Sequence, residues 1–165
     1  MNNKEILSDL LQRSRAYAKL KIRRRIDTAL HGQHPKAAVV CCSDSRVIPE
    51  EIFARSIGDI FVIRTAGNTA GVSEVESLSY AHHHLGIELF IVLGHTHCGA
   101  VDSTIHGEHC SIFDAIASHI GEEKDPKKAT MENARQVAKE LSSRFPEVDV
   151  VPLLYDIETG EVSRL

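Results

Sequence analysis

Several residue types and patterns are scarce or absent in this chain of 165 residues, and each such lack excludes some classes of protein. It has no tryptophan, aromatic residues make up 5% of it, and no stretch approaches the about 18 apolar residues that a membrane span needs. Its formal net charge is -4, whereas proteins that neutralise nucleic-acid phosphates usually carry a basic face. We therefore expect a globular protein with no membrane segment and no nucleic-acid partner.

Cysteine is sparse as well, with four residues, and the setting argues against disulfides. The N-terminal stretch MNNKEILSDLLQRSRAY mixes acids with bases and resembles neither a secretory signal nor a transit peptide. A cytoplasmic location is the expectation, and cytoplasmic cysteines serve as thiols or metal ligands. The basic cluster KLKIRRR over Lys19–Arg25 is interpreted as a solvated helix face.

The chain otherwise shows an alternation of helical and strand patterns. Apolar spacing predicts an N-terminal helix over Lys4–Tyr17, with a second short helical piece running to Leu30. Strands are predicted in AAVVCC, DIFVI, IELFIVLGH and VDVVPLLY, followed by a turn and a short last strand. Later helices are predicted after Pro49, from an N-cap at Ser73 to Leu85, and over 99–105, 112–120 and 130–144.

Strands that alternate with helices favour an α/β fold. We expect a mostly parallel central β-sheet of four to five strands, flanked by helices on both faces. The length of 165 residues fits one domain, 1–165, in which residues 1–30 form an N-terminal helical arm.

Residues that can do chemistry follow two of the predicted strands. The stretch VVCCSDSRVIPEE places Cys42, Asp44 and Arg46 at and just beyond one strand end. The stretch VLGHTHCGA ends another strand on His95 and Cys98. Reactive groups in open parallel sheets gather outside the carboxyl ends of the strands, so we expect these five residues to lie close together.

A Cys-His-Cys donor set suits zinc, and three protein ligands leave a tetrahedral ion one open position. His95 and Cys98 are separated by a strand-to-helix turn, so both side chains can converge on one ion. Asp44 beside Arg46 can be a fixed anion that accepts a hydrogen bond from metal-bound water, or an ion pair with no role. The nearest spare donors for a fourth ligand are Cys41, Asp44 and His97.

Three stretches together resemble the successive signatures of the β-class carbonic anhydrases. They are CSDSRV at Cys42–Val47, GDIFVIRTAGN at Gly58–Asn68 and GHTHCGAV at Gly94–Val101. The similarity extends through SLSYAHHHLGIELFIVLGH and, more weakly, to LLYDIETGEV. It therefore covers nearly the whole chain from about Ala37.

The resemblance implies a role for each candidate residue. Cys42, His95 and Cys98 are implied as ligands of one Zn²⁺ per chain, with Asp44 and Arg46 as the catalytic dyad. Asp44 is also implied as a fourth ligand in a closed state. The implied reaction is the reversible hydration of CO2 to bicarbonate and a proton, in which zinc-bound hydroxide, oriented by Asp44, attacks CO2 in an apolar pocket. The family further implies a homodimer or higher homo-oligomer, with the N-terminal helix packing on the partner.

Such a reaction has to export a proton in every cycle. Histidine is the side chain suited to carrying protons near neutral pH. The candidate carriers are His31, His34, His82 to His84, His97, His106 and His109.

Two positions depart from patterns seen in the family. Thr65 stands where members often have asparagine, and we expect this change to tune the site without abolishing activity. Val39 stands where members regulated by a noncatalytic bicarbonate pocket have tryptophan. That form of regulation is therefore not expected.

Three alternatives use the same residues. Relatives of this family hydrolyse carbonyl sulfide or carbon disulfide on the same fold and zinc site. A phosphatase-like thiol enzyme would need arginine where the chain has Val47 and Ile48, and the two adjacent cysteines lack the spacer of a redox pair. Strand alternation instead turns Cys41 toward the core. A noncatalytic zinc-binding module would leave Asp44 and Arg46 without a purpose.

Overall fold

The chain separates into two compact units, residues 1–33 and 34–165. The structure, a computed structural model, describes residues 2–30 and 32–165, and it describes side chains for residues 2–18 and 32–165. Across these described residues, no helix combines the length and the apolar character needed to cross a membrane. The single domain with an arm over 1–30 stays a prediction.

The first unit contains one long helix, α1 (Asn3–Leu30). Asn2 caps its start, because its Oδ1 accepts hydrogen bonds from the N–H groups of Lys4 and Glu5, both at 3.0 Å. In turn, the Glu5 carboxylate accepts a hydrogen bond from the N–H of Asn2 at 2.8 Å. The predicted end of a first helix at Tyr17 is wrong, because the helix continues through the following stretch of lysine and arginine, which are good helix formers.

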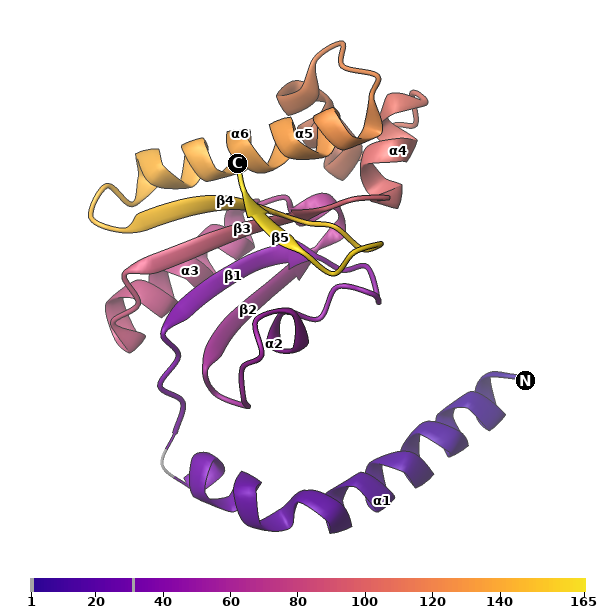
Figure 1. Ribbon diagram of the computed structural model, residues 1–165, viewed down its shortest axis with the longest axis vertical. Helices are drawn as coiled ribbons and strands as arrows, with labels where there is room; N and C mark the ends of the chain where they lie inside the picture. The colour runs from indigo at the N-terminus through magenta and orange to yellow at the C-terminus, as the bar shows by residue number, and fades with distance from the viewer. Residues whose placement is uncertain (1, 31) are drawn as a thin grey trace. The chain divides into compact units, whose positions relative to one another are not determined.

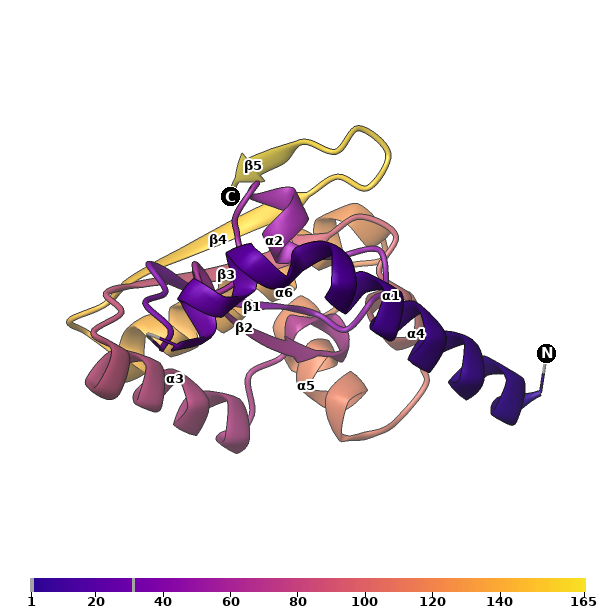
Figure 2. The same ribbon diagram turned by 90° about the horizontal axis from the view of Figure 1, so that it is seen from below.

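The second unit is built on a five-stranded sheet with the order β2-β1-β3-β4-β5 (Figure 1). The first four strands are parallel, and β5 pairs antiparallel with β4 at the sheet edge (Figure 2). This confirms the predicted α/β fold with a mostly parallel sheet. The strands are β1 (Ala37–Cys42), β2 (Ile60–Thr65), β3 (Leu89–His95), β4 (Asp149–Tyr155) and β5 (Val162–Arg164).

Helices fill the connections between the four parallel strands. They are α2 (Pro49–Ile52), the 3-10 turn η1 (Ala66–Asn68), α3 (Val72–Leu85), α4 (Gly99–Ile105), α5 (Ser111–Ile120) and α6 (Pro126–Arg144).

The start of α3 differs from the prediction. Its N-cap is Gly71 and not Ser73, because Glu74 is the acid that reaches back, with Oε2 accepting the Gly71 N–H at 2.9 Å. The Ser73 hydroxyl, already inside the first turn, donates to Glu74 Oε1 at 2.7 Å. An acid therefore stands three residues after the true cap, as in other helix starts.

Helix α6 also begins earlier than predicted. The sequence predicted a start at Thr130, but the helix begins at Pro126. Asp125 is the N-cap, and its Oδ1 accepts the N–H of Lys128 at 2.8 Å. Proline is well suited to the first position of a helix because the N–H that it lacks would have no helical partner there.

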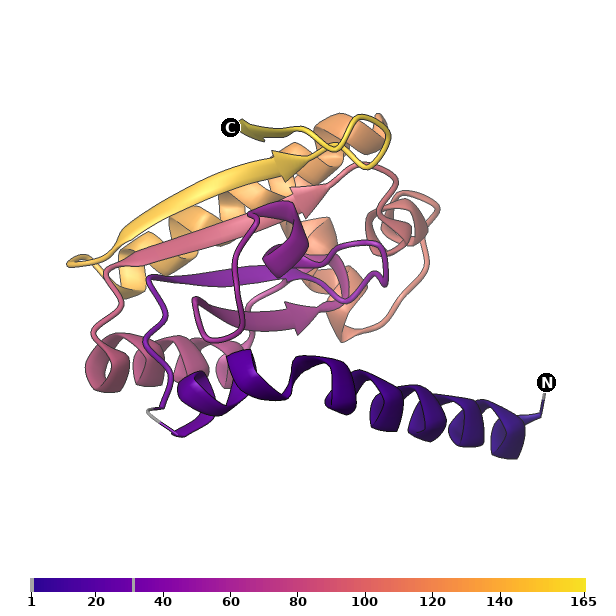
Figure 3. The ribbon, with the colours of Figure 1, turned by 60° about the horizontal axis from the view of Figure 1, so that its bottom comes forward.

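Within residues 34–165, helices lie on both faces of the sheet, as predicted, but unequally: α3 and α6 cover one face and the short α2 lies on the other (Figure 3). The strand order explains this. The chain steps from β1 outward to β2, then reverses to β3 and β4. Because parallel crossovers are right-handed, connections that run in opposite directions lie on opposite faces.

Alternation along the strands sorts the side chains into separate clusters. Ala38, Val40, Phe90 and Val92 pack against α3 and α6. Val39, Cys41 and Leu93 pack on the α2 face. Cys41 is completely buried there, which confirms its predicted direction. A third cluster, at the carboxyl ends of the strands, consists of Cys42, Cys98, Val101, Ile116, Ile120 and Ala129.

The assignment of the main core can be tested by a substitution at Phe90. Its ring is completely buried and lies edge-on to Phe145, with ring centroids 5.2 Å apart. We expect Phe90→Ala to lower the free energy of unfolding by about 3–5 kcal/mol, because it removes a large apolar side chain and leaves a cavity. Denaturant unfolding measures this, with Ile57→Ala at an exposed position as the control. Equal effects of the two changes would contradict the assignment of this core.

Candidate metal centre

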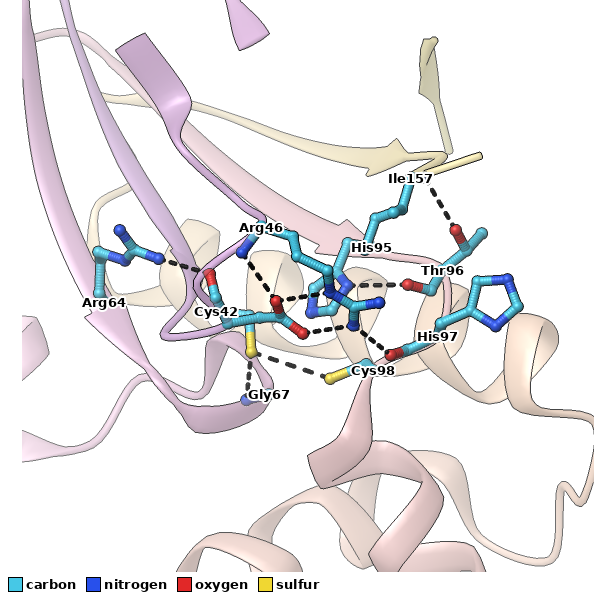
Figure 4. Close-up of polar contacts among 10 residues, drawn as sticks. Cys42, Arg46, Arg64, Gly67, His95, Thr96, His97, Cys98 and Ile157 are labelled. Atoms are coloured by element: carbon cyan, nitrogen blue, oxygen red, sulfur yellow. Dashed lines mark hydrogen bonds and ion pairs between the residues drawn. The ribbon is translucent and has the colours of Figure 1, made fainter. Parts of the chain in front are cut away.

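The carboxyl ends of β1 and β3 bring three donor side chains together. Cys42 is the last residue of β1, His95 is the last residue of the neighbouring strand β3, and Cys98 is the N-cap of α4. The two sulfur atoms are 3.9 Å apart, and all three donor atoms lie within 4.8 Å of one another. All three residues are buried, and Figure 4 shows them converging from the two strand ends.

The orientation of the His95 ring leaves one nitrogen available. Nδ1 lies 2.9 Å from the carbonyl oxygen of Thr96, so this nitrogen carries the proton and donates it. Nε2 is buried and has no hydrogen-bond partner among the described residues. A buried ring nitrogen with an unused lone pair, facing two sulfur atoms, is suited to a metal.

The distances agree with zinc in particular. Two thiolates bound to a tetrahedral zinc at about 2.3 Å each would be separated by about 3.8 Å, close to the 3.9 Å found between Cys42 and Cys98. The donor set therefore fits a zinc ion in both chemistry and size.

The loop between His95 and Cys98 is fixed by the hairpin of β4 and β5. The N–H of Thr96 donates to the Tyr155 carbonyl at 3.0 Å, and the Thr96 hydroxyl accepts the N–H of Ile157 at 3.0 Å (Figure 4). His97 has a positive φ of 57°, and its ring nitrogen lies 2.8 Å from Glu158. In Figure 4 this ring points away from the three donors, so His97 is not a fourth ligand in this arrangement.

The two thiols influence each other strongly. The hydrogen bond with Cys98 is the main reason that the pKa of Cys42 falls to about 4, against the opposing effect of burial. The same interaction, together with burial, raises the pKa of Cys98. One thiolate therefore forms readily and the second with difficulty, because two buried negative charges repel each other. A divalent cation between the sulfur atoms would remove this penalty.

Asp44 and Arg46 form a tight pair beside the donors. Arg46 donates from Nε to Asp44 Oδ1 at 2.9 Å, from Nη2 to Oδ2 at 2.6 Å, and from its backbone N–H to Oδ1 at 2.9 Å. Nη2 also donates to the carbonyl of His97 at 3.1 Å. The pKa of Asp44 lies well below its usual range, mainly because its carboxylate accepts hydrogen bonds from Arg46. Asp44 is therefore an anion held in a fixed direction.

A comparison with protein families decides the assignment. The family model described as "Carbonic anhydrase" matches residues 37–147, which is more than half of the 165-residue chain. This chain belongs to the β-class carbonic anhydrase family. The matched region contains both strand ends and all five candidate residues.

Individual carbonic anhydrases agree with this. A carbonic anhydrase of Synechocystis sp. is 48% identical over 77 residues, which cover 43% of this chain and 28% of that protein. The structure of the β-carbonic anhydrase CcaA is 28% identical, covers 98% of this chain and 86% of its own, and has a TM-score of 0.77. A tetrameric β-carbonic anhydrase of Sordaria macrospora, 20% identical with a TM-score of 0.81, covers 98% of this chain and 97% of its own and supports the fold.

The structure thus brings together all five residues that the sequence singled out. The roles of Cys42, His95 and Cys98 as ligands and of Asp44 and Arg46 as a dyad remain predictions. Among the suggested proton carriers, His31 lies outside the described residues.

Sequence reasoning missed the contact that the η1 turn makes with the site. The N–H of Gly67 donates to the Cys42 sulfur at 3.3 Å, and the Gly67 carbonyl accepts from Asn133 of α6 at 2.8 Å. The Gly-Asn pair after β2 indicated a turn, but no local pattern connected it with a helix far along the chain.

The pairing of Asp44 with Arg46 is testable by titration. An ionised Asp44 stabilises the folded chain above the ordinary carboxyl pKa of about 3.9, and this contribution is lost as the pH falls toward the lower pKa of the folded state. In Arg46→Gln we expect the Asp44 pKa, followed by carboxyl-carbon NMR, to rise. Arg13→Gln, which breaks an exposed ion pair in α1, is the control and should leave it unchanged. Identical Asp44 titrations in wild type and Arg46→Gln would contradict the pairing.

Proposed function

We propose that this chain is a zinc-dependent carbonic anhydrase that catalyses the reversible hydration of CO2 to bicarbonate and a proton. The observation that carries the proposal is the buried, unpartnered Nε2 of His95 within 4.8 Å of two thiol sulfurs. The family assignment supports the same reaction. The match with the Synechocystis relative spans only 28% of that protein, so carbonic anhydrase activity does not follow from that match alone and is proposed for this chain.

One Zn²⁺ per chain would be held by Cys42, His95 and Cys98. A zinc ion held by these three residues would have room for a water molecule and would act as a Lewis acid that lowers the pKa of that water. The Thr96 carbonyl holds the His95 ring through Nδ1, and such contacts to the second ring nitrogen fix a ligand's orientation.

Asp44 would act as the acceptor that orients the attacking oxygen. Its carboxylate is anionic because of Arg46, so it can accept a hydrogen bond but cannot donate one. The bidentate guanidinium keeps that carboxylate from turning. Arg46 thereby acts as a positioning residue for Asp44.

The substrate fits the surroundings of the site. Val101, Ile116, Ile120 and Ala129 form one apolar cluster with the two thiol residues. Carbon dioxide is small, uncharged and without a hydrogen-bond donor. An apolar wall next to a polar acceptor therefore suits CO2 better than it suits a charged substrate.

Asp44 as a fourth ligand would require a different arrangement. Both of its carboxylate oxygens accept from Arg46, and one also accepts the Arg46 backbone N–H. To reach the metal, the carboxylate has to give up these bonds. We therefore propose that Asp44 either pairs with Arg46 or, in the closed state, binds the metal, and that it does not do both at once.

The reaction is tested with zinc-loaded chain. We expect about one zinc per chain and CO2 hydration, with Asp44→Asn keeping its zinc and losing about 100-fold in kcat, the lower range for a group that handles a reacting proton. Asp114→Asn, at an exposed carboxylate, is the matched control.

Metal analysis and stopped-flow hydration assays measure these quantities, with carbonyl sulfide and carbon disulfide hydrolysis assayed in parallel. A chain that binds no zinc would sink the whole proposal. If the zinc-loaded chain hydrolyses only the sulfur compounds, then carbonyl sulfide or carbon disulfide is its substrate and CO2 is not.

We also propose that the protein is a homodimer or a higher homo-oligomer in the cytoplasm, with α1 packing on a partner. Four apolar side chains of the first three turns of this helix are exposed: Ile6, Leu7, Leu10 and Leu11. Such a stripe on one helix is typical of a surface that another element covers. The Sordaria macrospora enzyme, which shares the fold, is tetrameric.

The oligomer is tested by charging this stripe. We expect Leu7→Lys with Leu10→Lys to raise the dissociation constant more than about 100-fold, because burying two leucines contributes about 3 kcal/mol or more. Val72→Lys, at an exposed apolar position in α3, is the control. Analytical ultracentrifugation gives the mass. An unchanged mass for the double variant would exclude α1 from the interface.

A further inference from the structure

A chain of polar contacts connects the metal centre with two helices on the far side of the η1 turn. It begins at the Cys42 sulfur, which accepts the Gly67 N–H at 3.3 Å, and the Gly67 carbonyl accepts from Asn133 Nδ2 at 2.8 Å. Asn133 Oδ1 lies 2.8 Å from His119 Nδ1 of α5. His119 Nε2 ends the chain 3.2 Å from Glu140 of α6.

The directions of these bonds are fixed by the Gly67 carbonyl. A carbonyl can only accept, so the amide nitrogen of Asn133 must face it and the amide oxygen must face His119. His119 Nδ1 is then the donor to that oxygen. Asn133 is completely buried with both ends paired, and the His119 side chain is 10% exposed. A buried amide whose two ends are both satisfied cannot turn without losing two hydrogen bonds.

Gly67 needs this support because its backbone is unusual. Its φ is +66°, and a Cβ at this position would lie 2.5 Å from Cδ1 of Ile116. Glycine supplies the required conformation but does not enforce it, since it has the least restricted backbone of all residues. The hydrogen bond from Asn133 holds the peptide that follows Gly67, and it thereby restrains the φ and ψ angles through which the preceding peptide aims the Gly67 N–H at sulfur.

An N–H group directed at a thiolate changes the thiolate as a ligand. The hydrogen bond draws charge from sulfur, so that the sulfur donates less strongly to a metal, and such outer contacts tune metal sites generally. The Cys98 sulfur has backbone contacts of its own, from Val101 and Ala100 of α4. A change at the η1 turn is therefore expected to act on Cys42.

We propose that Asn133 and His119 are positioning residues of the metal centre, which fix the Gly67 turn so that its N–H sets the donor strength of Cys42. The inference rests on the proposed function in taking Cys42, His95 and Cys98 as the metal ligands. It assigns a role to two residues outside the three signature stretches.

The test uses the full chain loaded with Co²⁺, whose thiolate-to-metal absorption reports how strongly sulfur donates. Asn133→Leu keeps the number and branching of the side-chain heavy atoms and removes both hydrogen bonds. We expect its absorption band to move to lower energy, because a thiolate without the N–H contact gives up charge more easily.

Val137→Ala is the matched control, one turn further along α6 and completely buried in the main core. It should destabilise the chain but leave the cobalt band in place. A band in Asn133→Leu at the wild-type position would overturn the proposal. If Asn133→Leu does not fold, Asn133→Asp takes the same test, since it keeps the shape and loses the donor to Gly67.

His119 is tested by a pair of variants. His119→Leu removes the donor to Asn133 and should shift the band in the same direction by a smaller amount. His119→Gln, whose amide can donate to the same oxygen, should restore the wild-type band. A wild-type band in His119→Leu would remove His119 from the proposal. None of these readouts needs turnover, so a chain that binds metal normally but does not hydrate CO2 would refute the proposed function alone.

Discussion

The site depends on the adjacency of two parallel strands, β1 and β3, whose outgoing connections leave toward opposite faces of the sheet. This adjacency follows from the strand order, in which the chain moves from β1 to β2 and then returns past β1 to β3. In an open α/β sheet, the carboxyl ends of the strands at which the connections reverse direction are the usual place of a site. Cys42 and His95 end these two strands, so the fold itself brings them together.

This explains how much the sequence could predict. Apolar runs that stop on cysteine, aspartate, arginine or histidine mark strand ends, and parallel strands place such ends at one edge, so the five site residues were within reach of local patterns. Cys41 followed from simple alternation. Asn133 was not predictable, because its role depends on the packing of α6 against η1, and its sequence neighbours fit an ordinary amphipathic helix. The predicted N-cap at Ser73 and the predicted helix start at Thr130 were wrong, because Gly71 caps α3 and Pro126 begins α6, both further upstream.

Two side chains then join segments that the strands alone would leave independent. Arg46 binds the carboxylate of its own loop and the carbonyl of His97 in the loop after β3. Asn133 reaches from α6 to the turn after β2. Each of these two loops beside the donor residues is therefore tied to a segment far along the chain.

Charge balance connects this geometry with the proposed reaction. The buried thiol pair readily loses one proton and resists losing the second, so a divalent cation is what allows both sulfurs to be thiolates. Asp44 adds no net charge, because Arg46 already neutralises it. The two thiolates and the dication then sum to zero, as do Asp44 and Arg46. In the proposed reaction the incoming CO2 is uncharged, so its entry would change neither sum. Departure of bicarbonate and a proton together would leave both sums at zero again.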